Sequence, residues 1–223
     1  SDSIPLFAFI FKLFKNFLPE NFQYFSLWIV LSIYLQLLFS YLIIFNLTKN
    51  FYFSVISTFF FILAPIFLHR SGIHLSLMGQ WIILFSFYIE LNNSKSKPIL
   101  RGINLILSSL IHFYFTIILI ILNSLTFLFL LIEKKSLYKK VIIEIILIYP
   151  LLLITMYVAG YFMIRPEDGL GGGYGYFNLN LNSFFNPSGF NNSNSFNWSI
   201  LMPKQPLNNG EHEGFSYLGI GGF

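Results

Sequence analysis

The sequence predicts an all-α protein, a polytopic bundle of transmembrane helices. Long apolar stretches follow one another along the chain, and nearly all charged residues lie in the short segments between them. Hydrophobic residues make up 56% of the chain and charged residues only 10%, and the mean hydropathy is +0.70. A soluble domain would carry about a quarter charged residues. The apolar stretches are residues 24–46, 51–68, 73–91, 103–132 and 141–164, and a membrane-crossing helix needs roughly 20 such residues.

The first region, residues 1–20, differs from these stretches. In residues 4–18, Lys12 and Lys15 fall on one helical face, and apolar side chains cover the other. This pattern is typical of an amphipathic helix that lies in the membrane interface, following the end of an outer-face loop. The alternative is the end of a span that begins upstream. Pro19 ends the helix before the first full span.

Residues 103–132 are too long for one span and too short for two full spans, which need roughly 40 residues. If they form a broken hairpin that turns near His112, nearly all short-loop cations lie on one side of the membrane, as the positive-inside rule requires. One long helix would reverse this bias, so we expect the hairpin. Residues 21–164 then form a transmembrane region of five to six segments. The cations on the cytoplasmic side are Lys49, Lys95, Lys97, Arg101, Lys134, Lys135, Lys139 and Lys140.

Residues 165–214 form a long loop rich in Gly, Asn and aromatic residues. In the hairpin topology it is extracytoplasmic, on the same face as Asp2, His112 and a turn of residues 69–74. Loops of this length are usually functional or disordered, and the aromatic residues argue against disorder. Tyr174 and Tyr176 suit the binding of carbohydrate, but a structured cap with its own small core fits equally well.

Residues 215–223 read as the start of a further transmembrane helix. The chain begins without Met and ends as this apolar run starts, so we expect a fragment cut at both ends.

Three polar residues near the end of the second apolar stretch are candidates for phosphate binding. Arg70 offers a forked set of donors, and His69 and His74 add a donor or a proton carrier. The alternative is that they anchor a helix end at the interface. His112 is a further candidate, because an ionisable residue inside an apolar run marks a functional site by default; a neutral histidine bonded to a neighbouring helix is the alternative.

The outer loop ends in Glu211, His212 and Glu213, which alternate carboxylate, imidazole and carboxylate. A divalent metal could bind there only with ligands from elsewhere, such as His69 or Asp2. Capping of the next helix by Glu213 is the simpler interpretation. The net charge of +4 lies in membrane-flanking clusters, which indicates topology rather than nucleic-acid binding.

Four motifs carry a family resemblance. They are Asp2-Ser-Ile-Pro-Leu, Phe-Gln-Tyr-Phe-Ser-Leu-Trp at 22–28, Ala64-Pro-Ile-Phe-Leu-His-Arg-Ser-Gly-Ile-His74 and Gly210-Glu-His-Glu-Gly-Phe-Ser-Tyr-Leu-Gly219. Together they resemble an uncharacterised bacterial family of polytopic membrane proteins, a domain of unknown function related to the GT-C glycosyltransferases. The resemblance implies a GT-C-like fold in the bacterial inner (cytoplasmic) membrane. It also implies inverting transfer of a sugar from a polyprenyl-phosphate donor to a cell-surface glycan or lipid acceptor on the outer face.

The resemblance also implies roles for the candidate residues. Asp2 and Glu213 would be catalytic, and His69 and Arg70 would contact the donor phosphate. The other substrate-binding candidates are His74, His112, Tyr174, Tyr176, Glu211 and His212. Two other classes of function stay open: a transporter or flippase-like protein of cell-envelope biogenesis, with a path lined by His112, Gln80 and Arg70, and a scaffold subunit whose outer loop binds a partner.

Overall fold

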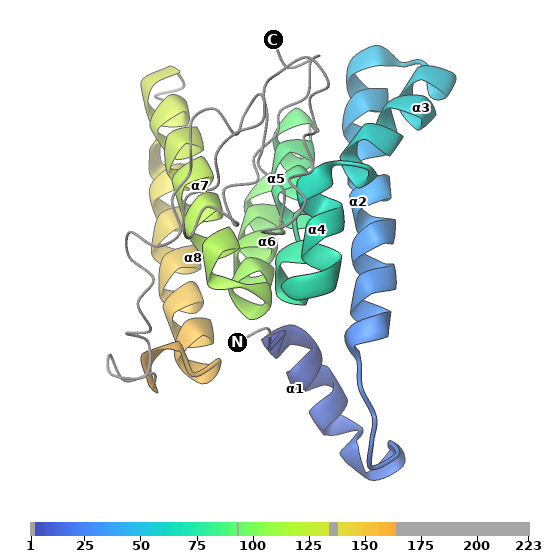
Figure 1. Cartoon of the computed structure of the whole chain (residues 1–223). Coiled ribbons are helices and arrows are strands. Elements are labelled where there is room, and N and C mark those ends of the chain that lie inside the picture. Colours follow the sequence, from blue (N-terminus) through green and yellow to red (C-terminus); the bar gives the residue numbers. More distant parts are fainter. Residues whose placement is uncertain (1–2, 93, 134–137, 164–223) are drawn as a thin grey trace, which may run out of the picture. The chain divides into compact units, whose positions relative to one another are not determined.

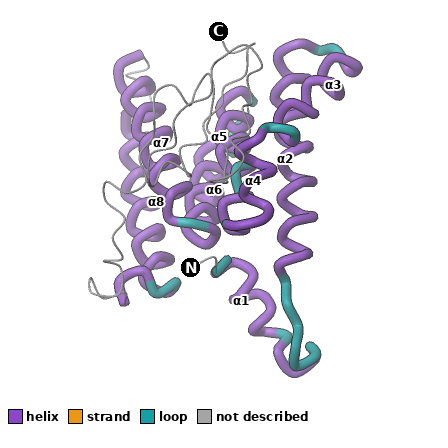
Figure 2. Tube along the Cα trace, in the orientation of Figure 1, coloured by secondary structure: helices purple, strands orange, loops and turns teal. Residues whose placement is uncertain are grey.

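The computed structural model describes residues 3–92, 94–133 and 138–163, and every regular element in these ranges is helical. Figures 1 and 2 show their arrangement. The expected all-α class is therefore confirmed for this part of the chain. In order, the elements are α1 (Pro5–Leu13), η1 (Lys15–Phe17), α2 (Phe25–Thr48), α3 (Phe51–Ile62), α4 (Pro65–Ile73), η2 (Leu75–Met78), α5 (Trp81–Leu91), α6 (Lys97–Ile111), α7 (Phe113–Glu133), α8 (Tyr138–Val158) and η4 (Tyr161–Met163).

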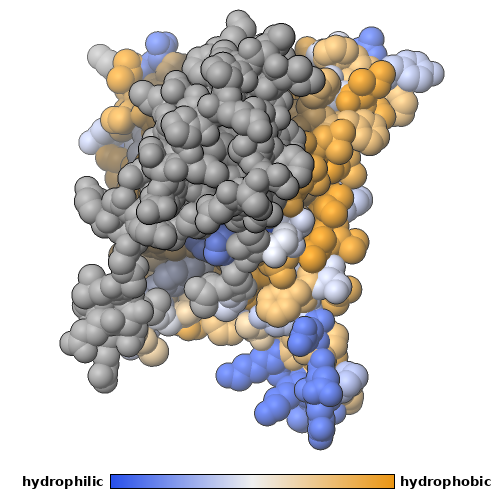
Figure 3. Space-filling model, viewed as in Figure 1, coloured by the Kyte–Doolittle hydropathy of each residue, from blue (hydrophilic) through white to orange (hydrophobic). Residues whose placement is uncertain are grey.

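Three of these helices, α2, α7 and α8, are long and apolar enough to cross a membrane. Helix α3 and residues 66–72 of α4 pass the same test only as a pair bent by 54°. Side chains such as Val30, Phe60 and Leu147 are mostly exposed, and Figure 3 shows a broad hydrophobic surface over α2 and α3. Apolar residues that face outward along helices of this length indicate a membrane protein.

Several small polar residues lie inside the bundle. The buried residues of α2 are Trp28, Ser32, Gln36 and Ser40, spaced by four along one face. The Ser40 hydroxyl donates to the Gln36 carbonyl at 2.6 Å, so it needs no partner from another helix. Small and weakly polar residues at helix contacts let helices approach closely where lipid provides the surrounding solvent.

Two hydrogen bonds define the two ends of the bundle. At one end, the Asn46 side chain donates to the Leu91 carbonyl at 3.4 Å. At the other, Trp28 Nε1 donates to the Leu75 carbonyl at 2.7 Å. Helix α2 and the η2–α5 segment therefore run parallel. We call the first the lysine end, because Lys49, Lys95, Lys97, Lys139 and Lys140 flank the helices there.

The chain reverses at His112, whose backbone is extended (φ −161°, ψ 140°) between α6 and α7. Ser108 and Thr116 approach to 3.5 Å across the turn, and farther along the Arg101 guanidinium lies 5.8 Å from the centre of the Phe127 ring. Helices α6 and α7 are therefore antiparallel neighbours. The reversal falls where the hairpin interpretation of residues 103–132 places it, although α6 begins earlier, at Lys97.

Helix α8 runs parallel to α6, and the two helices are joined by side-chain contacts at both ends of the bundle. Arg101 pairs with Glu144 at the lysine end, and the Tyr161 hydroxyl donates to the Ser109 carbonyl at 2.7 Å at the other. We call that opposite end the histidine end, because His74 and His112 lie there. Burial raises the pKa of the Tyr161 phenol, so this donor stays protonated.

The second apolar stretch differs from its expected form. Residues 69–74 were expected to form a turn after a span that reaches residue 68, but α3 ends at Ile62 and residues 65–73 form α4. Pro65 causes the difference. Its fixed φ suits the first position of a helix, and it holds the preceding Ala64 in a non-helical conformation (ψ 124°). His69 and Arg70 therefore lie within a helix.

Candidate functional site

The histidine end joins four segments that lie far apart in the sequence. The Phe7 ring of α1 packs edge-on against Trp28 of α2, with 5.5 Å between ring centres. Trp28 is fully buried and bonds to Leu75 of η2. Gly79, just after η2, lies so close to the α6–α7 corner that a Cβ on it would come within 2.7 Å of Ile111 Cγ2. The helix-to-helix connections at this end thus form one packed unit.

His112 has a structural role at this corner. Its Nδ1 accepts a hydrogen bond from the Tyr114 backbone N–H at 3.2 Å, which is how an N-cap side chain satisfies an N–H in the first turn of a helix. The accepting Nδ1 carries no proton, so in the neutral ring the proton is on Nε2. The histidine side chain therefore starts α7 and keeps one ring nitrogen as a donor.

Arg70 and His74 lie at the end of α4. Arg70 is in the last turn and half-buried, and its carbonyl accepts the His74 backbone N–H at 3.2 Å. His74 ends α4 and immediately precedes η2. The structure therefore brings His74 and His112 to the same end of the bundle, with Arg70 one helical turn from His74 along the chain.

The side chains of the remaining predicted site residues are not described. His69 is in α4, but its side chain is not described. Within the described residues, no group of three or more His, Cys, Asp or Glu side chains could hold a metal ion. Asp2, Tyr174, Tyr176, Glu211, His212 and Glu213 lie outside the described residues.

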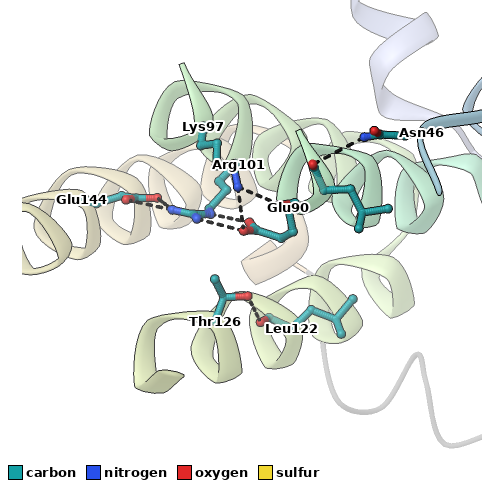
Figure 4. Close-up of polar contacts among 8 residues, drawn as sticks. Asn46, Glu90, Lys97, Arg101, Leu122, Thr126 and Glu144 are labelled. Carbon is teal, nitrogen blue, oxygen red and sulfur yellow. Dashed lines mark hydrogen bonds and ion pairs between the residues drawn. The ribbon is translucent and has the colours of Figure 1, made fainter. Parts of the chain in front are cut away.

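A second polar site lies at the lysine end, around Arg101 (Figure 4). Arg101 Nε and Nη2 donate to the two carboxylate oxygens of Glu90 at 2.6 and 3.1 Å. Arg101 Nη1 donates to both oxygens of Glu144 at 3.0 and 3.2 Å. Lys97 completes the cluster, because its Nζ donates to the Glu90 carbonyl at 2.7 Å and lies 4.0 Å from its carboxylate.

These contacts join four helices through one guanidinium. Glu90 comes from α5, Glu144 from α8 and the Phe127 ring from α7, while Arg101 itself is on α6. The side chains of Arg101 and Glu144 are only 6% and 7% exposed. Charges buried this deeply persist only when they are paired and hydrogen-bonded, and here the forked geometry of Arg meets both carboxylates.

Next to this cluster is a pocket of about 910 Å³. Its polar wall includes Lys95, Lys97, Arg101 and Lys140, together with Glu90 and Glu144. Its apolar wall includes Leu125, Phe129 and Leu130 of α7. Four cations against two acids give the wall a net positive charge. Because the two carboxylates pair with Arg101, this positive charge is carried by the lysines.

Comparison with known protein families gives one finding. The model of a domain of unknown function, DUF6311, matches residues 1–223, which is the whole chain. The chain belongs to the DUF6311 family. Comparisons with curated proteins and with solved structures gave no match. The expected membership of an uncharacterised domain family is thus confirmed, and the three membrane-length helices of this DUF6311 chain agree with the expected membrane protein.

The sequence interpretation of the DUF6311 chain missed the Arg101 cluster. Arg101 was counted among the flanking cations of the cytoplasmic side, and Glu90 was given no role. A signal was present in α6: Arg101, Asn104, Ser108 and Ser109 recur at helical spacing and are all buried. In a membrane helix, a stripe of polar residues indicates the face turned toward the other helices.

Proposed function

We propose that this DUF6311 chain is part of a GT-C-type glycosyltransferase of the bacterial inner membrane. It would transfer a sugar from a polyprenyl-phosphate donor to a cell-surface glycan or lipid acceptor on the non-cytoplasmic face. The observation that supports this proposal best is the convergence of α1, the α4–η2 segment and the His112 corner at the histidine end, opposite the lysine end. The positive-inside rule assigns the lysine end to the cytoplasm.

The form of α1 and η1 agrees with a membrane-surface site. Leu13 of α1 and Phe17 of η1 are 82% and 87% exposed, and they alternate with the exposed Lys12 and Lys15. Exposed large apolar residues beside lysines are typical of a segment at the lipid headgroups. A polyprenyl-phosphate donor has its phosphate at this depth, so the enzyme would meet the phosphate near the ends of its helices.

Arg70 and His69 would bind the donor phosphate in this proposal, with His74, His112, Tyr174, Tyr176, Glu211 and His212 as the further substrate-binding residues. Asp2 and Glu213 would act as the catalytic carboxylates. A divalent metal remains an open alternative for the Glu211–Glu213 segment, with ligands from another part of the chain.

Substitution of Arg70 tests the phosphate role. We expect Arg70→Ala to lower sugar transfer roughly 10- to 100-fold, because a charge-assisted hydrogen bond to a phosphate contributes about 1.5–3 kcal/mol. Arg70→Lys should also be impaired, because it loses the forked geometry. The measurement is transfer of labelled sugar from polyprenyl-phosphate-sugar in membranes that contain the complete protein, with equal protein amounts verified.

Lys15→Ala is the matched control, since it removes an exposed cation near the same end and should keep full activity. Full activity of Arg70→Lys would reduce Arg70 to a helix anchor. Absence of transfer with every polyprenyl-phosphate-linked sugar supplied would contradict the glycosyltransferase proposal.

A flippase-like function is the second candidate, and the buried Arg101 cluster favours it. Buried ionisable residues at membrane depth often mark substrate pathways in transporters. The product separates the two functions, because transfer changes the covalent attachment of the sugar and translocation does not.

A further inference from the structure

The lysine end holds a second opening that adjoins the 910 Å³ pocket. It has a volume of about 360 Å³ and lies between α6 and α8. The two share Pro98, Lys140 and Glu144 as lining residues. The opening is thus a groove that continues from the charged pocket along the two helices.

The groove is apolar along its length. Beyond the shared residues it is lined by side chains such as Ile103 and Ile106 of α6 and Leu147 and Leu151 of α8. Three of these, Ile103, Leu147 and Leu151, are 46%, 66% and 47% exposed, so they form ridges on the lipid-facing surface. At Gly102 the two helices approach each other closely, because a Cβ there would lie 3.3 Å from Ile148 Cγ1, so α6 and α8 form the floor of the groove. A groove of this kind fits an acyl chain.

The charged pocket at the head of the groove fits a phosphate. Lys97 donates a hydrogen bond to Glu90, and Arg101 donates to the carboxylates of Glu90 and Glu144. Lys95 and Lys140 line the pocket, and neither forms an ion pair in the part of the chain that the structure describes. The N-terminus of α6, which begins at Lys97, adds the partial positive charge of a helix end.

From this geometry we propose that the pocket and groove together bind one anionic phospholipid, with its phosphate at Lys95 and Lys140 and an acyl chain between α6 and α8. The site lies at the opposite end of the bundle from the proposed transfer site, and it does not depend on that function. The ligand carries both a negative headgroup and an apolar chain, which distinguishes it from a free phosphate ion. The lysines match the anionic lipids of a cytoplasmic leaflet, where each Lys near the surface contributes attraction.

Lipid binding to the complete protein in a neutral detergent tests the proposal. Native mass spectrometry would measure the first bound molecule of phosphatidylglycerol and, separately, of phosphatidylcholine. We expect phosphatidylglycerol to bind at least about tenfold more tightly, because the two lysines each contribute on the order of a fivefold factor. Equal binding of the two lipids would overturn the proposal.

Two double variants localise the site. Lys95→Gln with Lys140→Gln removes the two pocket lysines and should bring phosphatidylglycerol to the affinity of phosphatidylcholine. Lys49→Gln with Lys139→Gln removes the same charge from the same end without touching a pocket-lining residue, and should change affinity less than twofold. An equal loss in both double variants would show diffuse attraction and would overturn the site.

A substitution in the groove and a competing ligand test whether the site binds a phospholipid or a free phosphate ion. Ile106→Trp fills the groove and should weaken the binding of phosphatidylglycerol by about tenfold, although the pocket lysines stay in place. The control is Leu128→Trp, which changes an exposed α7 residue outside the groove. Glycerol phosphate at millimolar concentration should not displace the lipid. Displacement by glycerol phosphate, or no effect of Ile106→Trp, would assign the site to a phosphate ion and overturn the lipid.

Discussion

At the scale of single residues, the buried charged side chains of the described residues, Arg101 and Glu144, lie in one cluster. Two carboxylates, Glu90 and Glu144, occupy all three guanidinium nitrogens. The three residues come from separate helices, so the ion pairs hold α5, α6 and α8 in register. Breaking such a pair leaves a buried charge without its partner, whereas removing all charged members together costs much less.

Arg101→Met should therefore destabilise the protein by about 3–5 kcal/mol, because Glu144 stays buried without a cation, while the half-buried Glu90 keeps only Lys97 at 4.0 Å. The triple variant Glu90→Gln, Arg101→Met and Glu144→Gln should recover most of this loss. Thermal unfolding of the purified protein in a mild detergent measures both. A triple variant as unstable as the single one would show that Arg101 acts through packing rather than through charge.

At the scale of elements, the sequence predicts the longest helices best. The stretch 24–46 became α2 (Phe25–Thr48), and 141–164 became α8 (Tyr138–Val158), which continues through Pro150. A long apolar run forms a helix in lipid because a helix satisfies its own backbone hydrogen bonds. Hydropathy excluded charged residues such as Lys139 from the expected spans. In the structure Lys139 belongs to α8, which therefore begins before the expected span.

Shorter elements were harder to predict, since local chemistry decides them. Pro65 starts α4 inside what hydropathy shows as one continuous run, and η2 separates α4 from α5 within the stretch 73–91. The Arg101 cluster shows the same limit for sites. Glu90 and Glu144 are 54 positions apart in sequence, and only the helix packing brings them to one guanidinium.

The contact between η2 and the α6–α7 corner gives an element-scale prediction. Gly79→Ala would place a Cβ 2.7 Å from Ile111 Cγ2 and 3.1 Å from the Phe115 ring. We expect a loss of about 1–3 kcal/mol, the usual cost of overpacking, measured as a lower melting temperature.

Gly72→Ala in α4 is the matched control, because its Cβ would meet nothing within 4 Å. Alanine also favours a helix over glycine, so this variant should be neutral or slightly stabilising. Equal melting temperatures for the two variants would contradict the close approach of Gly79 to the corner.

At the scale of the described bundle, residues 3–163 with their gaps, the helices divide polar chemistry between two ends. The lysine end holds the Arg101 cluster and the pocket proposed for a lipid headgroup. The histidine end holds α1, the end of α4 and the His112 corner. If the lysine end faces the cytoplasm, as the positive-inside rule requires, the proposed sugar transfer takes place on the outer side and the proposed lipid site on the inner side.

Single-cysteine labelling in cells tests this division most directly, and the chain contains no cysteine of its own. Asn16→Cys and Ser71→Cys probe the histidine end, and Asn50→Cys and Lys139→Cys probe the lysine end, all at exposed positions. The complete protein is labelled in cells whose outer membrane is permeabilised and whose inner membrane is intact. A membrane-impermeant maleimide should then label positions 16 and 71. Positions 50 and 139 should react only after the inner membrane is permeabilised. Labelling of position 139 with protection of position 71 would contradict the account, because the proposed transfer site would then face the cytoplasm.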